Sequence, residues 1–172
     1  MRKQLIAIAL TVLASGGIAR AADAPNDAQI AHIAYTAGLI DIAAAEQAIE
    51  KSKNPDIISF AQEMERDHKA VNDQALALVK KLGGKPEDNP TSQTLNKNAK
   101  AELAALEKLR GSAFDKAYID NEVAYHKAVD AALSTTLIPS AHNAELKSLL
   151  ETGLTLFKEH QMHAEQLAAK LK

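Results

Sequence analysis

Residues 55–82 read PDIISFAQEMERDHKAVNDQALALVKKL, and apolar side chains recur along them at alternating spacings of four and three residues. This period is typical of an α-helix that buries one face. The positions on that face are Ile57, Ala61, Met64, His68, Val71, Ala75, Leu78 and Leu82. His68 is the one residue among them that is not apolar, so the segment predicts a packed helix with a single imidazole on its buried side.

The same period on either side of this segment predicts three more long helices. One is expected to begin at an Asn26 or Asp27 cap and to run to about residue 53, where Asn54 and Pro55 stop it. The others are expected over residues 112–133, after a start at Ser112 that resembles a capping box, and from residue 141 to the C-terminus. Residues 134–140, which include a proline, are interpreted as the turn between those two helices.

The lengths of the connections favour a particular topology. Short turns join the first helix to the second and the third to the fourth, so each pair is expected to be antiparallel. Between the pairs lie about thirty residues, with a shorter helix expected over residues 95–110. The sequence therefore predicts an all-α fold, a ferritin-like four-helix bundle with a long crossover that contains a short extra helix. An up-down-up-down bundle with a decorated loop is the alternative.

Composition agrees with helices and excludes several functions. The 172 residues include no Cys and no Trp, and only 3% are aromatic. Disulfides, thiolate metal sites and Cys nucleophiles are thereby excluded. The formal net charge is −2, and no basic stripe is present, so no nucleic-acid partner is expected. The sequence identifies neither a protein partner nor an oligomeric state.

Residues 1–21 have the pattern of a cleavable signal peptide. Arg2 and Lys3 precede an apolar run over residues 5–13, and Ala19 and Ala21 form an A-x-A cleavage signal. Cleavage is expected after Ala21, which leaves residues 22–172 as the helical domain. The apolar run is too short to span a bilayer comfortably, so we expect a periplasmic protein with no transmembrane segment in the mature chain. Nothing in the residues supports outer-membrane association.

Polar residues interrupt the buried face of every long helix. Five of them are candidate metal ligands: Asp41, His68, Asp115, His126 and His160. A buried carboxylate without a partner costs several kcal/mol, so it is expected to find a proton, a cation or a hydrogen-bond donor. Imidazole and carboxylate groups together suit Fe, Zn, Cu or Ni. A metal-free network, in which Asp67, Asp41 or Tyr118 orients the imidazoles, is the alternative, and Asp115 is equally suited to a helix cap.

The turns decide which of these residues can meet. A turn near Asn54 places Asp41 and His68 at the same height on the first two helices. A turn near residue 137 places Asp115 level with His160. Depending on how the two pairs align, either Asp115 and His160 or His126 alone completes the cluster. Glu122 and His163 are interpreted as lying at the edge of the buried faces, where they reach solvent.

The complete ligand set of a di-iron carboxylate protein is absent. Such proteins use Glu on two helices and Glu-x-x-His on the other two. Glu65 and His68 fit that spacing once, but Phe157 stands where His160 would need its Glu partner. The sequence therefore favours a binding protein over an enzyme and identifies no catalytic residue.

Several short motifs together resemble one known family. They are Gly38-Leu39-Ile40-Asp41, Asn54-Pro55, Phe60-Ala61, Met64, Asp67-His68, Gly111, Phe114-Asp115, Tyr118, His126 and His160. In this order they resemble the exported domain-of-unknown-function family 4142, whose members are often labelled predicted outer membrane or ferritin-like proteins. The resemblance covers about residues 28–168. It implies a ferritin-like fold and an exported location, and it supplies no enzymatic activity.

Overall fold

The computed structural model describes residues 24–171, and within this part of the chain the protein is all helical with no strand. The elements are α1 (Asp27–Lys51), α2 (Pro55–Lys81), α3 (Pro90–Glu107), α4 (Gly111–Ala132), the π-helical turn η1 (Leu133–Leu137), α5 (Ile138–Ser140) and α6 (Ala144–Lys170). The predicted all-α class is thereby confirmed. The predicted signal peptide, with Ala19 and Ala21, lies outside the described residues.

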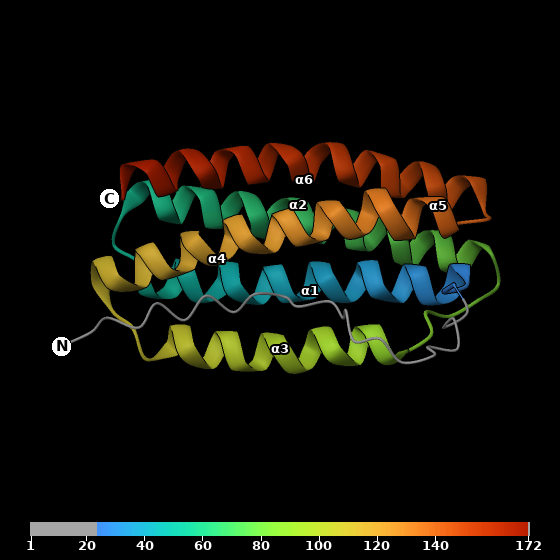
Figure 1. The fold of residues 1–172 in the computed structure, drawn as a ribbon, viewed down its shortest axis with the longest axis horizontal. Helices are drawn as coiled ribbons and strands as arrows, with labels where there is room; N and C mark the ends of the chain where they lie inside the picture. Colours follow the sequence, from blue (N-terminus) through green and yellow to red (C-terminus); the bar gives the residue numbers. More distant parts are fainter. Residues whose placement is uncertain (1–23, 172) are drawn as a thin grey trace, which may run out of the picture.

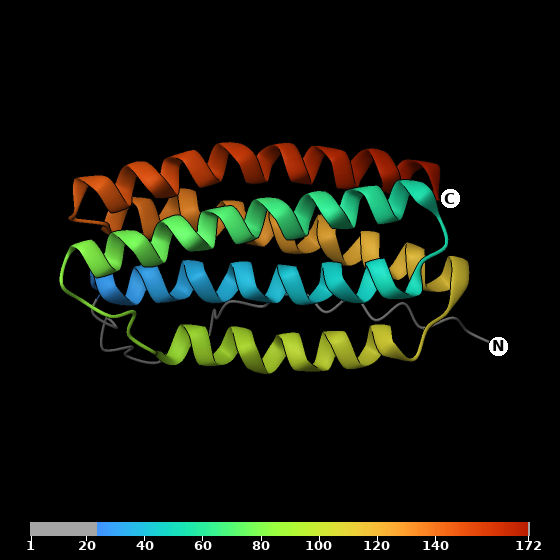
Figure 2. The same cartoon turned by 180° about the vertical axis from the view of Figure 1, so that it is seen from behind.

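Four long helices, α1, α2, α4 and α6, pack side by side, and α3 lies along the outside of α1 (Figures 1 and 2). Two contacts fix the direction of the chain. The Asp27 carboxylate accepts hydrogen bonds from the backbone N–H groups of His142 and Asn143, at 2.8 and 2.9 Å, which ties the start of α1 to the start of α6. At the other end, Lys51 Nζ donates to the Glu107 carbonyl oxygen. The connection through α3 therefore crosses the full length of the molecule.

Side-chain caps explain where most of these helices begin. Asn26 and Gln29 form a capping box at the start of α1, and Asn54 caps α2 ahead of Pro55. Asn89 and Ser92 form a second capping box, which begins α3 at Pro90 rather than at the predicted residue 95. The cap supplies acceptors for the first N–H groups, so the helix can start before its apolar residues do.

The predicted turn over residues 134–140 is wrong. The helix of α4 continues through η1 and α5 as far as Ser140, and the chain reverses over residues 141–143. Pro139 follows the π-helical turn η1, and Leu137 and Ile138 before it have helical φ and ψ values, so the helical path continues up to the proline. Asn143 then caps α6. The reversal thus comes about five residues later in the chain than the sequence indicated.

Buried apolar residues form two separate clusters. One contains Ala45 and Ala48 of α1, Phe60 and Met64 of α2, and Phe114 of α4. The other contains Ile30 and Leu146 at the opposite end of the molecule. Along every long helix, a buried polar residue lies between the segments that feed the two clusters, so a polar layer separates two apolar halves.

By length and composition, α1 is the one helix in the described part of the chain that could cross a bilayer. Half of its most apolar stretch is buried within the protein. A core helix has the same properties, so this is weak support for a membrane span.

Candidate metal centre

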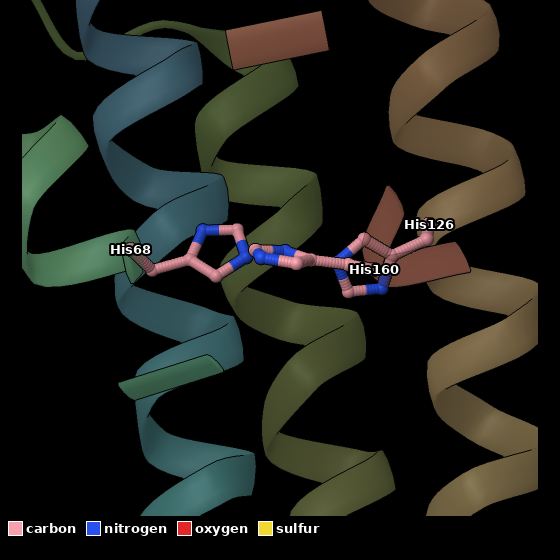
Figure 3. Close-up of side chains that lie close together, drawn as sticks. All are labelled: His68, His126 and His160. Atoms are coloured by element: carbon pink, nitrogen blue, oxygen red, sulfur yellow. The ribbon is translucent and has the colours of Figure 1, made fainter. Parts of the chain in front are cut away.

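Three histidines converge in the polar layer from three different helices (Figure 3). His68 comes from α2, His126 from α4 and His160 from α6, and none is more than 3% exposed. Each offers a ring nitrogen, and these nitrogens all lie within 4.8 Å of one another. The ring centroids are 5.5 to 5.7 Å apart. We call these three residues the His triad.

Asp41 of α1 adds a carboxylate to the triad. Its Oδ2 lies 3.4 Å from Nε2 of His68 and 3.6 Å from Nε2 of His126. Among the described residues, neither of its oxygens has a hydrogen-bond partner, although the residue is only 1% exposed. Glu122 of α4 is equally buried, and it forms a second possible ligand group with Asp41 and His126.

Neighbouring acceptors fix which nitrogen of two histidines carries the proton. Nδ1 of His126 lies 3.1 Å from the Glu122 carbonyl oxygen, and a carbonyl only accepts, so Nδ1 is the donor. Nε2 of His160 lies 3.1 Å from Asp67 Oδ2 and donates to that carboxylate in the same way. The opposite nitrogens, Nε2 of His126 and Nδ1 of His160, therefore carry lone pairs. Imidazole ligands of metal ions are commonly oriented by such outer hydrogen bonds.

Two hydrogen-bond acceptors therefore face each other at Asp41. The lone pair on Nε2 of His126 faces the Asp41 carboxylate at 3.6 Å. Two acceptors at that separation repel unless a proton or a cation lies between them. The geometry thus calls for a proton or a cation at the place where the carboxylate meets the triad.

Burial perturbs the titration of the whole group. It lowers the pKa of His68 and of His126 to about 4, and it also lowers the pKa of His160. Burial raises the pKa of Asp41 to about 6, against the opposing effect of His126. It also raises the pKa of Glu122 well above its usual value, with added repulsion from Asp41. The imidazoles are therefore neutral at pH 7, which is the form that binds a metal ion.

An aromatic ring replaces the glutamate of a second Glu-x-x-His motif. Phe157 stacks on the His68 ring, with centroids 4.6 Å apart and an interplanar angle of 14°. Glu65, which precedes His68 at the right spacing, instead pairs with Lys69. Neither of these two positions contributes a glutamate to the triad.

The structure brings together four of the five predicted ligands. The four that meet in the polar layer are Asp41, His68, His126 and His160. Each of the two helix arrangements that the sequence allows leaves out either His126 or His160. Both join because the chain reverses at residues 141–143, which makes His126 rather than Asp115 level with His160. Asp115 belongs to none of the ligand groups found in the described residues. It lies eleven residues before His126, about 16 Å along the helix.

Two other expectations about the polar residues can be compared with the structure. The predicted cap at the start of α4 is wrong, because Arg110 occupies the N-cap position without a side-chain hydrogen bond. The interpretation of Glu122 as an edge residue is also wrong, since its side chain is 1% exposed. His163, by contrast, is 40% exposed and pairs with Glu63, a residue that the sequence pattern did not single out.

Fold and site together define an all-helical protein with a buried histidine and carboxylate centre. The chain belongs to the family described as Domain of unknown function (DUF4142), whose family model matches residues 14–167. This confirms the resemblance drawn from the sequence motifs. No curated protein and no solved structure matches the chain.

Proposed function

We propose that this protein is an exported, ferritin-like four-helix protein that binds a transition-metal ion at the His triad, for metal handling or stress protection. The pattern of residues 1–21 supports export. The path of α3 supports the ferritin-like topology, because the end-to-end crossing makes α4 run parallel to α2.

The single observation that carries the metal proposal is the convergence of three buried imidazoles beside the buried Asp41 carboxylate. The outer hydrogen bonds leave a lone pair on His126 and on His160, and His68 has no hydrogen-bond partner on either nitrogen among the described residues. Three imidazoles suit Zn, Cu, Fe or Ni. The nearby Asp41 carboxylate would offset part of the charge of a divalent ion and complete the ligand set.

Metal analysis of protein purified without a His-tag tests the proposal. We expect the wild-type protein to retain or take up one transition-metal ion with micromolar affinity or better, and the His68→Ala/His160→Ala variant to bind none there. The His32→Ala/His142→Ala variant is the matched control, because it also removes two histidines but none from the triad. His126→Gln, which keeps most of the side-chain volume, covers the case in which the double variant does not fold.

A wild-type protein that neither retains metal nor takes any up at micromolar concentration would overturn this function. The polar layer would then act as a metal-free network that specifies core packing in a structural or interaction module of the cell envelope. Chelator treatment would in that case leave the unfolding temperature of the wild-type protein unchanged.

A further inference from the structure

A line of four polar side chains on α2 and α6 connects the His triad with solvent. The exposed fraction of these side chains falls stepwise from 40% for His163 to 33% for Glu63, 17% for Asp67 and 1% for His160. Glu63 and Asp67 are one turn apart on α2, and the two histidines are one turn apart on α6, so the line follows the contact between these helices.

Hydrogen bonds join the line in pairs. Nδ1 of His163 lies 2.8 Å from a Glu63 carboxylate oxygen, and Nε2 of His160 lies 3.1 Å from an Asp67 carboxylate oxygen. Arg66 also pairs with Asp67, at 2.7 Å from Nε to Oδ1, so the Asp67 carboxylate lies between an exposed cation and the triad.

His160 belongs to two ligand groups at once. Glu63, Asp67 and His160 each offer a ligand atom, and these atoms lie within 4.8 Å of one another, as do those of the His triad. One nitrogen of His160 faces Asp67, and the other has no hydrogen-bond partner among the described residues. A cation held by the carboxylates of the first group is thus already next to a residue of the second. To bind His160 on that side, the cation must displace the Nε2 proton that hydrogen-bonds Asp67.

We propose that Glu63, Asp67 and His163, with His160, form a second, solvent-accessible binding site for a divalent transition-metal ion, through which the ion reaches the buried triad. The mixture of carboxylate and imidazole ligands suits the same ions as the triad. Two carboxylates at the mouth of the line would also raise the local concentration of cations. Arg66 pairs with Asp67 and is 69% exposed, so it covers the site in the metal-free protein without being fixed there. The role of this outer site as a loading route rests on the proposed function.

Loading kinetics test the route. Metal-stripped protein is mixed with Co²⁺, and the absorption of the bound ion is followed with time. We expect Glu63→Gln and His163→Gln to slow loading by about tenfold or more, while the final absorption stays that of the wild-type protein. Arg66→Gln is expected to speed loading, because it uncovers Asp67. Glu65→Gln is the matched control, since Glu65 lies on the same helix with a similar exposed fraction of 29% and pairs with Lys69.

A titration separates the outer site from the triad. In a His68→Gln background, which disables the triad and keeps the outer residues, we expect one weak equivalent of Co²⁺ that Glu63→Gln removes. Unchanged loading in both outer-site variants would overturn the route, and absence of the weak equivalent would overturn the site. If the wild-type protein binds no metal at the triad, the proposed function fails, whereas the weak equivalent still decides whether the outer site exists.

Discussion

Asp41→Asn in metal-free protein tests the electrostatics of the polar layer. Burial raises the pKa of Asp41 from 3.8 to about 6, so at pH 7.5 the folded protein holds a carboxylate that the unfolded chain ionises more easily. A difference of about two pKa units corresponds to about 3 kcal/mol of destabilisation at pH 7.5. Because the folded-state pKa is raised, this destabilisation is complete above pH 6 and is relieved as the pH falls toward 3.8. At pH 5 about half of it remains.

The expected result is therefore a pH-dependent difference between the variant and the wild-type protein. The free energy of unfolding of Asp41→Asn, taken relative to that of the wild-type protein, should be higher at pH 7.5 than at pH 5 by about 1 kcal/mol. The cost of burying the amide is the same at both pH values, so it does not contribute to this difference. His68 and His126, which face Asp41 from α2 and α4, have pKa values of about 4 and stay largely neutral over this range. Glu122, the other facing group, has its pKa raised well above the usual value by burial and by repulsion from Asp41.

Urea denaturation of chelator-treated protein at the two pH values gives the free energies of unfolding. Asp120→Asn is the matched control, because Asp120 lies on α4 with its side chain 51% exposed and pairs with Lys116. The control is expected to show a much smaller change with pH. An Asp41→Asn difference that is equal at pH 7.5 and pH 5, or larger at pH 5, would refute the reasoning.

Two further predictions concern packing and the histidines. Gly38→Ala should lower the free energy of unfolding by about 1 to 3 kcal/mol, because its Cβ would lie 2.9 Å from Cγ of Asn72. Gly153→Ala, whose Cβ would make only ordinary contacts at 3.5 Å or more, should instead be neutral or stabilise the protein by up to about 1 kcal/mol, and equal urea midpoints for the two variants would contradict this. His68→Gln should gain stability relative to metal-free wild type by about 1 kcal/mol per pH unit as the pH falls from 6.5 toward 4. The reason is that burial lowers the pKa of His68 to about 4, so as the pH falls the unfolded wild-type chain takes up a proton on this residue before the folded protein does. Parallel curves of stability against pH for the variant and the wild-type protein would exclude this account.

Helical periodicity was sufficient to predict most of the centre. Asp41, His68, His126 and His160 stand out because each interrupts an apolar face, and a period of 3.6 residues can be counted without knowing the fold. Periodicity did not show how the helices align. The alignment depends on where the chain reverses, and a proline at residue 139 is compatible both with a turn and with the first turn of a helix.

The remaining residues of the site depend on contacts between distant segments. Glu122 lies on a predicted buried face. A long charged side chain at such a position can also lie at the edge of the face and reach solvent, and the sequence does not show which neighbouring helix covers it. Glu63 gives no signal of its own, because its partner His163 is 100 residues later in the chain. The sequence predicts for Asp67 only the role of orienting an imidazole, and in the structure Asp67 accepts a hydrogen bond from His160.

The polar layer between the two apolar clusters affects whether the two halves of the bundle can open independently. Apolar packing links the helices within each half, but at the layer the links between helices are polar groups, several of them unpartnered among the described residues. Bonds from one ion to side chains of α2, α4 and α6 would join three helices at this polar layer. Local opening of one half could then no longer proceed independently of the other. The rigidity of the whole bundle would thus depend on whether metal is bound, and occupancy of one small site would affect both halves of the protein.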